Sequence, residues 1–398
     1  MKIISVVGAR PNFMKIAPFV RAVENYNQTP DLPTKRQVHH VLVHTGQHYD
    51  VSMSQAFFKA LNIPDPDINL EVGSGSHAEQ VGNTMIAFEK VLRQEKPDWV
   101  VVVGDVNATL ACSVTAKKEG VRVCHIEAGL RSGDLTMPEE INRLVTDRLA
   151  DLLLTPDRLS IENLKKEGVA ENKIVFVGNI MIDTLEANRA KAAKLNVEDI
   201  CTENRLLEVK SKNANKSLKT EISALKKGNY AVITMHRPSN VDHPHVLRPL
   251  ITFLCQVVTQ DMPLIWPIHP RAEKRLQEFG LWDEVIKSKN MILLKPIGYH
   301  EMLRLNMDAR MVFTDSGGLQ EECTVLGTPC LTLRWNTERP VTLREHGGAS
   351  VLVGNDVEKI RTEYKKTLAS ERNPMRPELW DGNTSGRCLR AILNYKIK

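Results

Sequence analysis

The chain has 398 residues, of which 42% are hydrophobic and 25% are charged, and it carries a formal net charge of +5. This composition is ordinary for a globular protein and excludes a disordered, collagen-like or coiled-coil chain. The positive charge is too small for the dense basic surface of a nucleic-acid-binding protein, although it suits an anionic small substrate. At about 150 residues per domain, the length predicts two or three domains, and two is the simpler interpretation.

The cysteines and the start of the chain indicate a reducing compartment. The seven cysteines are scattered, odd in number and without a Cys-x-x-Cys pair, so neither a disulfide framework nor a structural zinc site is expected. The start, 1–7, is too short for a signal peptide, and no apolar run approaches the ~20 residues of a membrane helix. We therefore expect a cytoplasmic protein that binds neither membrane nor nucleic acid.

The first half of the chain alternates short apolar runs with helical patterns. Continuous apolar runs are typical of parallel strands that are covered on both faces. We expect strands at 3–7, 40–44, 99–103, 121–126, 151–154 and 174–177. A helix is expected over 78–93, with Ser76 and Glu79 forming a capping box at its start. The alternation predicts a doubly wound parallel sheet.

The pattern changes after about residue 185 and restarts near residue 230. The intervening stretch is rich in Lys, Asn and Glu, which predicts an exposed helical bridge or an insertion. Further strands are then expected at 230–234, 264–268, 291–294, 311–314, 331–333 and 350–353. We therefore predict an α/β fold of two Rossmann-like domains, with ligands in a cleft at the carboxyl ends of their strands. The predicted divisions are an N-terminal domain (1–183), a bridge (184–229), a C-terminal domain (230–370) and a segment that crosses back to the first domain (371–398).

The strongest local signal is the run Thr-Asp-Ser-Gly-Gly at 314–318, which ends a predicted strand and opens a helix. Ser316, Gly317 and Gly318 would let the backbone approach a ligand closely, and the helix N-terminus favours an anion. The run is also compatible with a plain tight turn. Its spacing matches neither a dinucleotide-binding loop nor a Walker loop, so we expect no cofactor. Glu322 is placed to accept hydrogen bonds from a ribose.

Two cations follow the first predicted strand. Arg10 lies next to a glycine, and Lys15 lies one helical turn further on. Arginine suits bidentate contacts with phosphate or carboxylate, and lysine acts as a compact charge. The alternative is that both are solvated surface charges.

Three carboxylates and one histidine also follow predicted strands. Asp105, Glu127 and Glu139 lie on or near successive strand ends, where neighbouring strands about 5 Å apart would let them share a pocket and exchange protons. Helix capping is the alternative for Asp105 and Glu139. His236 could act as a cation or an acid. A metal site is not expected, because His44 and His48 have i, i+4 spacing without a helix to carry them.

Together these motifs resemble one family. The sequence is similar to the non-hydrolysing UDP-N-acetylglucosamine 2-epimerases nearly end to end. The specific matches are Gly8-Ala9-Arg10-Pro11, His125-Ile126-Glu127-Ala128-Gly129-Leu130-Arg131, Pro138-Glu139-Glu140-Ile141-Asn142-Arg143, Thr314-Asp315-Ser316-Gly317-Gly318, Thr337-Glu338-Arg339-Pro340 and Gly382-Asn383-Thr384-Ser385-Gly386.

The resemblance implies a GT-B fold, a homodimer and a UDP-sugar substrate held mainly by the second domain. It implies chemistry at Asp105, Glu127, Glu139 and His236. It implies UDP-sugar contacts at Arg10, Lys15, Met302, Ser316, Gly317, Gly318, Glu322 and Arg339, with Met302 standing where the family tends to have an aromatic ring near the uracil.

The implied reaction is reversible C2 epimerisation of UDP-N-acetylglucosamine to UDP-N-acetylmannosamine. It runs by loss and return of UDP through a 2-acetamidoglucal. Two faces of C2 need two acid–base groups, for which we favour Glu139 and Asp105, with Glu127 as their partner. Two alternatives stay open: a 2-epimerase of a UDP-2,3-diacetamido-uronic acid, and a retaining glycosyltransferase of the same fold.

Overall fold

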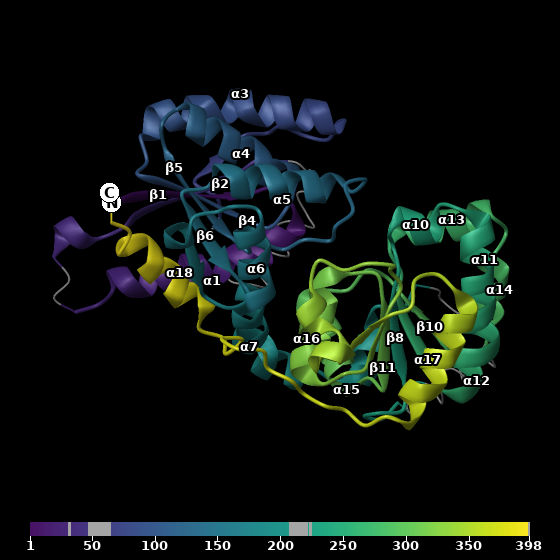
Figure 1. Ribbon diagram of the computed structural model, residues 1–398. Helices are drawn as coiled ribbons and strands as arrows, with labels where there is room; N and C mark the ends of the chain where they lie inside the picture. The colour runs from purple at the N-terminus through teal and green to yellow at the C-terminus, as the bar shows by residue number, and fades with distance from the viewer. Residues whose placement is uncertain (31–32, 47–64, 207–221, 223–224, 397–398) are drawn as a thin grey trace. The chain divides into compact units, whose positions relative to one another are not determined.

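Two compact units make up the protein in this computed structural model, which describes residues 1–30, 33–46, 65–206, 222 and 225–396. One unit comprises Met1–Ala187 together with Pro377–Lys398, and the other comprises Asn188–Arg376 (Figure 1). The chain therefore passes between the units twice, at Ala187–Asn188 and at Arg376–Pro377.

The first unit is built on a parallel sheet whose described strands number seven, in the order β3-β2-β1-β4-β5-β6-β7. The strands are β1 (Lys2–Val7), β2 (His39–His44), β3 (Ile68–Asn69), β4 (Trp99–Val103), β5 (Arg122–Ile126), β6 (Leu152–Thr155) and β7 (Ile174–Phe176). Its helices are α1 (Arg10–Asn27), α3 (His77–Glu95), α4 (Asn107–Lys118), α5 (Pro138–Leu149), α6 (Arg158–Lys166), α7 (Ile180–Ala193) and α18 (Thr384–Leu393). This order is that of a Rossmann fold, extended by β7.

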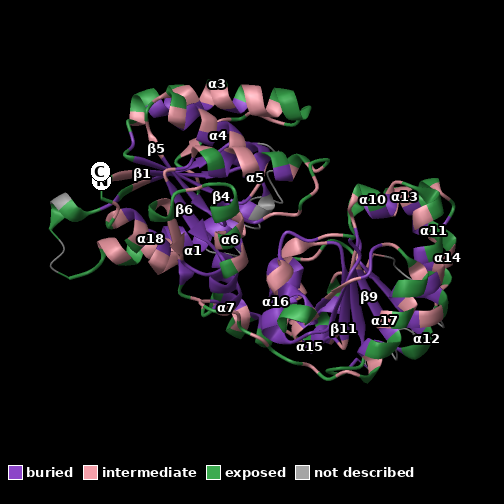
Figure 2. Cartoon of the chain, in the orientation of Figure 1, coloured by how far each residue is buried: buried purple, intermediate pink, exposed green. Residues whose placement is uncertain are grey.

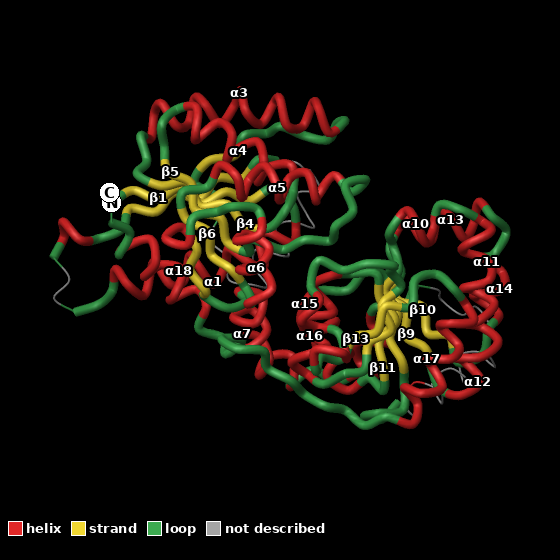
Figure 3. The backbone as a smooth tube through the Cα atoms, viewed as in Figure 1, coloured by secondary structure: helices red, strands yellow, loops and turns green. Residues whose placement is uncertain are grey.

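Helices cover both faces of this sheet, with α3, α4 and α5 on one face and α1 and α18 on the other (Figure 3). Every residue of β4, Trp-Val-Val-Val-Val, is buried for that reason. Ser76 and Glu79 form the predicted capping box at the start of α3.

The second unit has its own parallel sheet, with six described strands in the order β10-β9-β8-β11-β12-β13. The strands are β8 (Ala231–Thr234), β9 (Leu264–Pro267), β10 (Met291–Leu294), β11 (Met311–Thr314), β12 (Cys330–Thr332) and β13 (Ser350–Leu352). The helices are α8 (Val197–Glu203), α10 (Pro238–Val241), α11 (Pro244–Phe253), α12 (Thr259–Asp261), α13 (Pro270–Glu278), α14 (Trp282–Lys287), α15 (Tyr299–Asp308), α16 (Gly317–Leu326) and α17 (Val357–Ala369). A π-helical turn, Leu254–Val258, joins α11 to α12.

Alternate residues of the second sheet pack into two separate cores. Ala231 and Ile233 of β8 lie in the core formed with α11, α13 and α17, whereas Val232 lies in the core formed with α8, α15 and α16. Both sheets form the buried centre of their unit (Figure 2). The predicted α/β class with two Rossmann-like domains is therefore confirmed.

The stretch predicted as an exposed bridge is not exposed throughout. Despite its polar composition, it contains three apolar residues of α8, namely Val197, Ile200 and Cys201, which are buried against the second sheet. Residues 207–221 and 223–224 of this stretch lie outside the described residues. The compact units divide after Ala187 and after Arg376. This division does not test the predicted domain boundaries at 183, 229 and 370, which stay predictions.

The last segment of the chain packs within the first unit. Trp380 is buried and donates a hydrogen bond of 3.0 Å from its indole N–H to the carbonyl oxygen of Pro156. The backbone N–H groups of Thr384 and Ser385, at the start of α18, donate to the carboxylate of Asp183 in α7 at 2.9 and 2.7 Å. These contacts fix the return of the chain to the first unit.

One glycine permits this return and gives a test of it. Gly178 has a φ of +90°, and a Cβ there would overlap the carbonyl group of Leu379. Gly168 has a similar φ of +77° with nothing near its Cβ position. We expect Gly178→Ala to lower the free energy of unfolding by about 2–4 kcal/mol, from backbone strain plus overlap, and Gly168→Ala by only about 1 kcal/mol. Urea denaturation measures both, and equal losses would contradict the contact.

Candidate functional site

A buried ion pair lies at the carboxyl edge of the first sheet. Lys15 of α1 pairs with Glu127, which directly follows β5, and both side chains are buried. Gly104, directly after β4, lies against this pair, since a Cβ there would be 3.2 Å from Lys15 Nζ and 3.6 Å from Glu127 Oε2. Three separate segments of the chain therefore meet at one point.

The two carboxylate oxygens of Glu127 have different surroundings. Oε2 contacts the ammonium of Lys15, whereas Oε1 is buried and has no hydrogen-bond partner in the described part of the chain. Burial of a carboxylate is costly without an opposite charge, which Lys15 supplies. The structure therefore excludes a solvated surface position for Lys15 and gives it a carboxylate neighbour. Arg10 begins α1, and its side chain lies outside the description.

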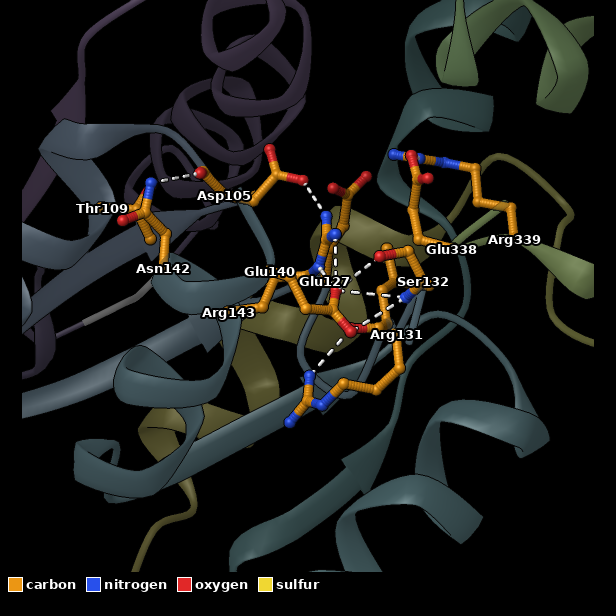
Figure 4. A network of polar contacts seen from close by, with 12 residues as sticks. Asp105, Thr109, Glu127, Arg131, Ser132, Glu140, Asn142, Arg143, Glu338 and Arg339 are labelled. Atoms are coloured by element: carbon orange, nitrogen blue, oxygen red, sulfur yellow. Dashed lines mark hydrogen bonds and ion pairs between the residues drawn. The ribbon is translucent and has the colours of Figure 1, made fainter. Parts of the chain in front are cut away.

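A second group of charges surrounds Asp105. The guanidinium of Arg143, on α5, is buried and lies between the carboxylates of Asp105 and Glu140 (Figure 4). Arg143 donates to Glu140 Oε2 at 2.9 Å from Nε and at 2.6 Å from Nη2. Burial alone would raise the pKa of Glu140, but hydrogen bonds from the Ser132 backbone and from Arg143 hold it below its ordinary value.

The two glutamates of the Pro-Glu-Glu motif, in the first turn of α5, have different environments. Glu139 is half-buried and has no ion-pair or hydrogen-bond partner among the described residues, whereas Glu140 is buried in the network. Sequence reasoning selected Glu139 and did not select Glu140 or Arg143. The i, i+3 spacing of Glu140 and Arg143 is a signal that could have found them, because it places both on one helix face.

In the second unit, a histidine and an aspartate meet at the ends of adjacent strands. His236 Nδ1 lies 2.9 Å from Oδ1 of Asp315, and 42% of the His236 side chain is exposed. Asp315 is fully buried, and its Oδ2 accepts hydrogen bonds from the backbone N–H groups of His236 and Arg237. Burial acts to raise the pKa of Asp315, but the contact with His236 holds it below its ordinary value. Asp315 therefore orients the imidazole, a role that sequence reasoning missed.

The glycine run 316–318 opens α16 as expected. Ser316 is the residue before the helix, and its N–H donates to Oγ1 of Thr314 at 3.0 Å. A Cβ on Gly317 would lie 2.6 Å from Nη1 of Arg339, so this arginine reaches the helix N-terminus. Arg339 is buried and pairs with Glu338 and, at 2.7 Å, with Glu321. The predicted arginine and glycines are therefore together, and Gly318 is the second residue of the helix.

Two further predicted residues lie on neighbouring helices of this unit. Glu322 of α16 is buried, and burial raises its pKa to about 7, although the neighbouring Tyr299 and Asn306 act to lower it. Met302 of α15 is partly buried and packs against the core that α8, α15 and α16 form with the second sheet. Glu322 can therefore hold a proton near neutral pH, when it can donate as well as accept a hydrogen bond.

Neither a metal centre nor a membrane span is found in the described residues. No three His, Cys, Asp or Glu side chains of the described residues gather closely enough to hold a metal ion. In the same part of the chain, no helix is both long and apolar enough to cross a bilayer.

These features define a class of protein: a two-domain Rossmann-type α/β protein with carboxylates at the strand ends of one sheet and a glycine-rich helix N-terminus at a strand end of the other. A family model described as UDP-N-acetylglucosamine 2-epimerase matches residues 31–393. The chain belongs to this family, which confirms the resemblance drawn from its motifs and its assignment to the epimerases.

Known relatives match over nearly the whole chain. A UDP-N-acetylglucosamine 2-epimerase of Methanocaldococcus jannaschii is 39% identical over 396 residues, which cover 99% of both chains. A crystal structure of the M. jannaschii enzyme in complex with UDP-GlcNAc and UDP has a TM-score of 0.83 at 38% identity, covering 98% of this chain and 99% of that one. A UDP-2,3-diacetamido-2,3-dideoxy-D-glucuronate 2-epimerase of Pseudomonas aeruginosa is 35% identical over 379 residues, which cover 93% of this chain and 94% of the relative.

The buried Glu322 gives a prediction about pH. In the unfolded chain it ionises near pH 4.5, whereas in the folded protein burial raises its pKa to about 7. Ionisation therefore favours the unfolded state increasingly between these values and by a constant amount above pH 7. Glu322→Gln should match the wild type near pH 4.5 and exceed its free energy of unfolding by up to about 3 kcal/mol at pH 8.

Denaturation at both pH values measures this difference. Glu358→Gln, at an exposed glutamate of α17 in the same unit, is the control and should show no such gain. A pH-independent difference for Glu322→Gln would contradict the effect of burial.

Proposed function

We propose that this protein inverts C2 of UDP-N-acetylglucosamine to give UDP-N-acetylmannosamine, reversibly. Membership of the epimerase family supports this activity. The observation that carries it is the two ion pairs at the edge of the first sheet, Lys15 with Glu127 and Arg143 with Asp105. We assign Glu139, in the first turn of the helix that carries Arg143, to the same group of acids. The expected use of such a cluster is proton transfer to and from carbon.

The chemistry explains why an acid cluster needs a diphosphate site. The C2 proton of the sugar has no adjacent carbonyl group, so its direct removal is too slow. Departure of UDP from C1 creates an oxocarbenium-like centre that acidifies this proton. Loss of the proton leaves a 2-acetamidoglucal and UDP, and protonation at the opposite face of C2 with return of UDP completes the inversion.

The second unit would stabilise the departing UDP. His236, oriented by Asp315, and the N–H groups at the start of α16 are suited to the negative charge that builds on the diphosphate. We assign Arg339 and Arg10 to the same task. Glu322 would bind the ribose, and Met302 would contact the uracil. Lys15, besides pairing with Glu127, would place a positive charge near the leaving group.

The exposure of the three acids supports a division of their roles. The side chain of Asp105 is 25% exposed and Glu139 is half-buried, so both are accessible to a ligand, whereas only 2% of the Glu127 side chain is exposed. We propose that Asp105 and Glu139 transfer protons on opposite faces of C2. Glu127, fixed by Lys15, would set the charge around them.

A second substrate has one specific observation in its favour. The Pseudomonas aeruginosa relative is named for a UDP-2,3-diacetamido-glucuronate and is 35% identical to this chain. It would need the same inversion at C2, with an additional carboxylate on the sugar. Comparing kcat/KM for the two UDP-sugars decides between these substrates.

The family resemblance also supports a homodimer in the cytoplasm. We propose both as properties of this chain. Light scattering during size-exclusion chromatography measures the mass of the assembly against that of the 44.8 kDa chain.

The reaction makes a direct prediction in D₂O. NMR should show conversion of UDP-N-acetylglucosamine to UDP-N-acetylmannosamine with deuterium at C2, because the acids exchange their protons with solvent. Asp105→Asn should lose at least about a hundredfold in kcat, as expected for removal of an acid–base group, and should keep its affinity for UDP.

The control is Asp151→Asn. Asp151 also pairs with a cation, Lys117 at 2.8 Å, but it lies next to the amino end of β6, so kcat should stay within about twofold of the wild type. Free N-acetylmannosamine as the product would indicate hydrolysis. Absence of turnover would contradict the proposed activity.

A further inference from the structure

Behind the acid cluster lies a buried histidine–aspartate pair that the proposed chemistry does not use directly. His125 of β5 and Asp147 of α5 are buried, with His125 Nδ1 2.6 Å from Asp147 Oδ1. The other ring nitrogen, Nε2, lies 2.9 Å from the carbonyl oxygen of Gly104. Both ring nitrogens of His125 and both carboxylate oxygens of Asp147 are bonded within the unit, so we assign neither residue a direct contact with substrate.

The partners of the ring determine where its protons are. A carbonyl oxygen can only accept, so the contact with Gly104 requires a hydrogen on Nε2. Burial acts to raise the pKa of Asp147, but His125 and Arg131 hold it below its ordinary value, so Asp147 is ionised. An ionised carboxylate can also only accept, so Nδ1 carries a hydrogen as well. The ring is therefore an imidazolium, bonded at both nitrogens.

Each end of this pair holds a turn that carries one acid of the cluster. At one end, His125 fixes the carbonyl of Gly104, the residue directly before Asp105. At the other end, Oδ2 of Asp147 accepts from the N–H of Gly129 at 3.0 Å, two residues after Glu127.

The turn at Glu127 needs such support. Glu127 has a φ of +69°, a left-handed conformation that is unfavourable for a residue with a side chain. Asp147 also pairs at 2.7 Å with Arg131, further along the same turn. The His125–Asp147 pair thus connects the turns after β4 and β5 from within the unit.

We infer that His125 and Asp147 are positioning residues that hold Asp105 and Glu127 in their working geometry through an imidazole bonded at both of its ring nitrogens. This inference rests on the proposed epimerisation, because it assigns the pair to the same acids. Displacement of a reacting group by about 1 Å can cost a hundredfold in rate. Loss of the pair should therefore reduce turnover without weakening the binding of UDP.

The protonation of the ring can be measured without any assay of activity. Nitrogen-15 NMR of the histidine-labelled wild type at pH 8 should show His125 with hydrogens on both ring nitrogens. His40 is the internal contrast, because its Nε2 bonds to the Ser5 hydroxyl rather than to a carboxylate and burial lowers its pKa to about 4, so its ring should be neutral. A neutral His125 ring would overturn the inference.

The effect on catalysis is tested with Asp147→Asn, which keeps the size of the side chain. We expect His125 to lose one ring proton and kcat to fall at least about tenfold, while KM and the Kd for UDP change less than about threefold. His40→Gln, on β2 of the same sheet, should leave kcat within about twofold of the wild type.

The outcomes separate the two proposals. A kcat for Asp147→Asn within about threefold of the wild type would overturn the positioning role. A rise in KM as large as the fall in kcat would indicate general damage to the protein rather than a positioning role. A wild type that fails to epimerise contradicts the proposed function. The NMR spectrum decides the state of the ring in either case, even if Asp147→Asn does not fold.

Discussion

The candidate site depends on buried carboxylates that are paired with buried cations. Glu127 is tolerated in the interior because Lys15 lies against it, and Arg143 does the same for Glu140 while it also pairs with the partly exposed Asp105. Removing one member of such a pair leaves an uncompensated buried charge, which costs about 3–5 kcal/mol. In the proposed reaction, the same pairing would keep negative charges next to the carbon that loses its proton, so stability and chemistry would depend on one arrangement.

The fold supplies this arrangement through the ends of its strands. Parallel strands bring residues that are distant in sequence to one edge of a sheet, and turns after β4 and β5 aim Asp105 and Glu127 there. In the second sheet, the same principle brings His236 against Asp315. The left-handed backbone at Glu127 shows that its position is specified at some cost, which is common at functional sites.

Much of the fold follows from the sequence, because strands that are buried on both faces read as continuous apolar runs. The strand at 99–103 was predicted at its observed bounds, whereas β3 (Ile68–Asn69) was missed because two residues form no run. The polar stretch around α8 concealed Val197 and Ile200, whose burial comes from contacts with the second unit's core rather than from local composition.

The site was less predictable, because its pairings join distant segments. Motifs identified the candidate acids, but nothing local shows that Lys15 meets Glu127, 112 residues away, or that Arg143 meets Asp105. The adjacent Glu139 and Glu140 are told apart by the helix that turns Glu140 inward, and the i, i+3 spacing of Glu140 and Arg143 is the only local sign of that orientation. The contacts of His125 could not be predicted either, because both of its partners, Asp147 and the carbonyl of Gly104, lie in other segments of the chain.

The central claim is that two acids act on opposite faces of C2, and hydrogen exchange in D₂O tests it most directly. Asp105→Asn and Glu139→Gln should each be given UDP-N-acetylglucosamine and UDP-N-acetylmannosamine separately, and deuterium at C2 of the recovered sugar followed by NMR. The account predicts opposite selectivity, with each variant still exchanging the C2 hydrogen of one sugar and not that of the other. Variants that lose or keep exchange equally with both sugars would contradict it.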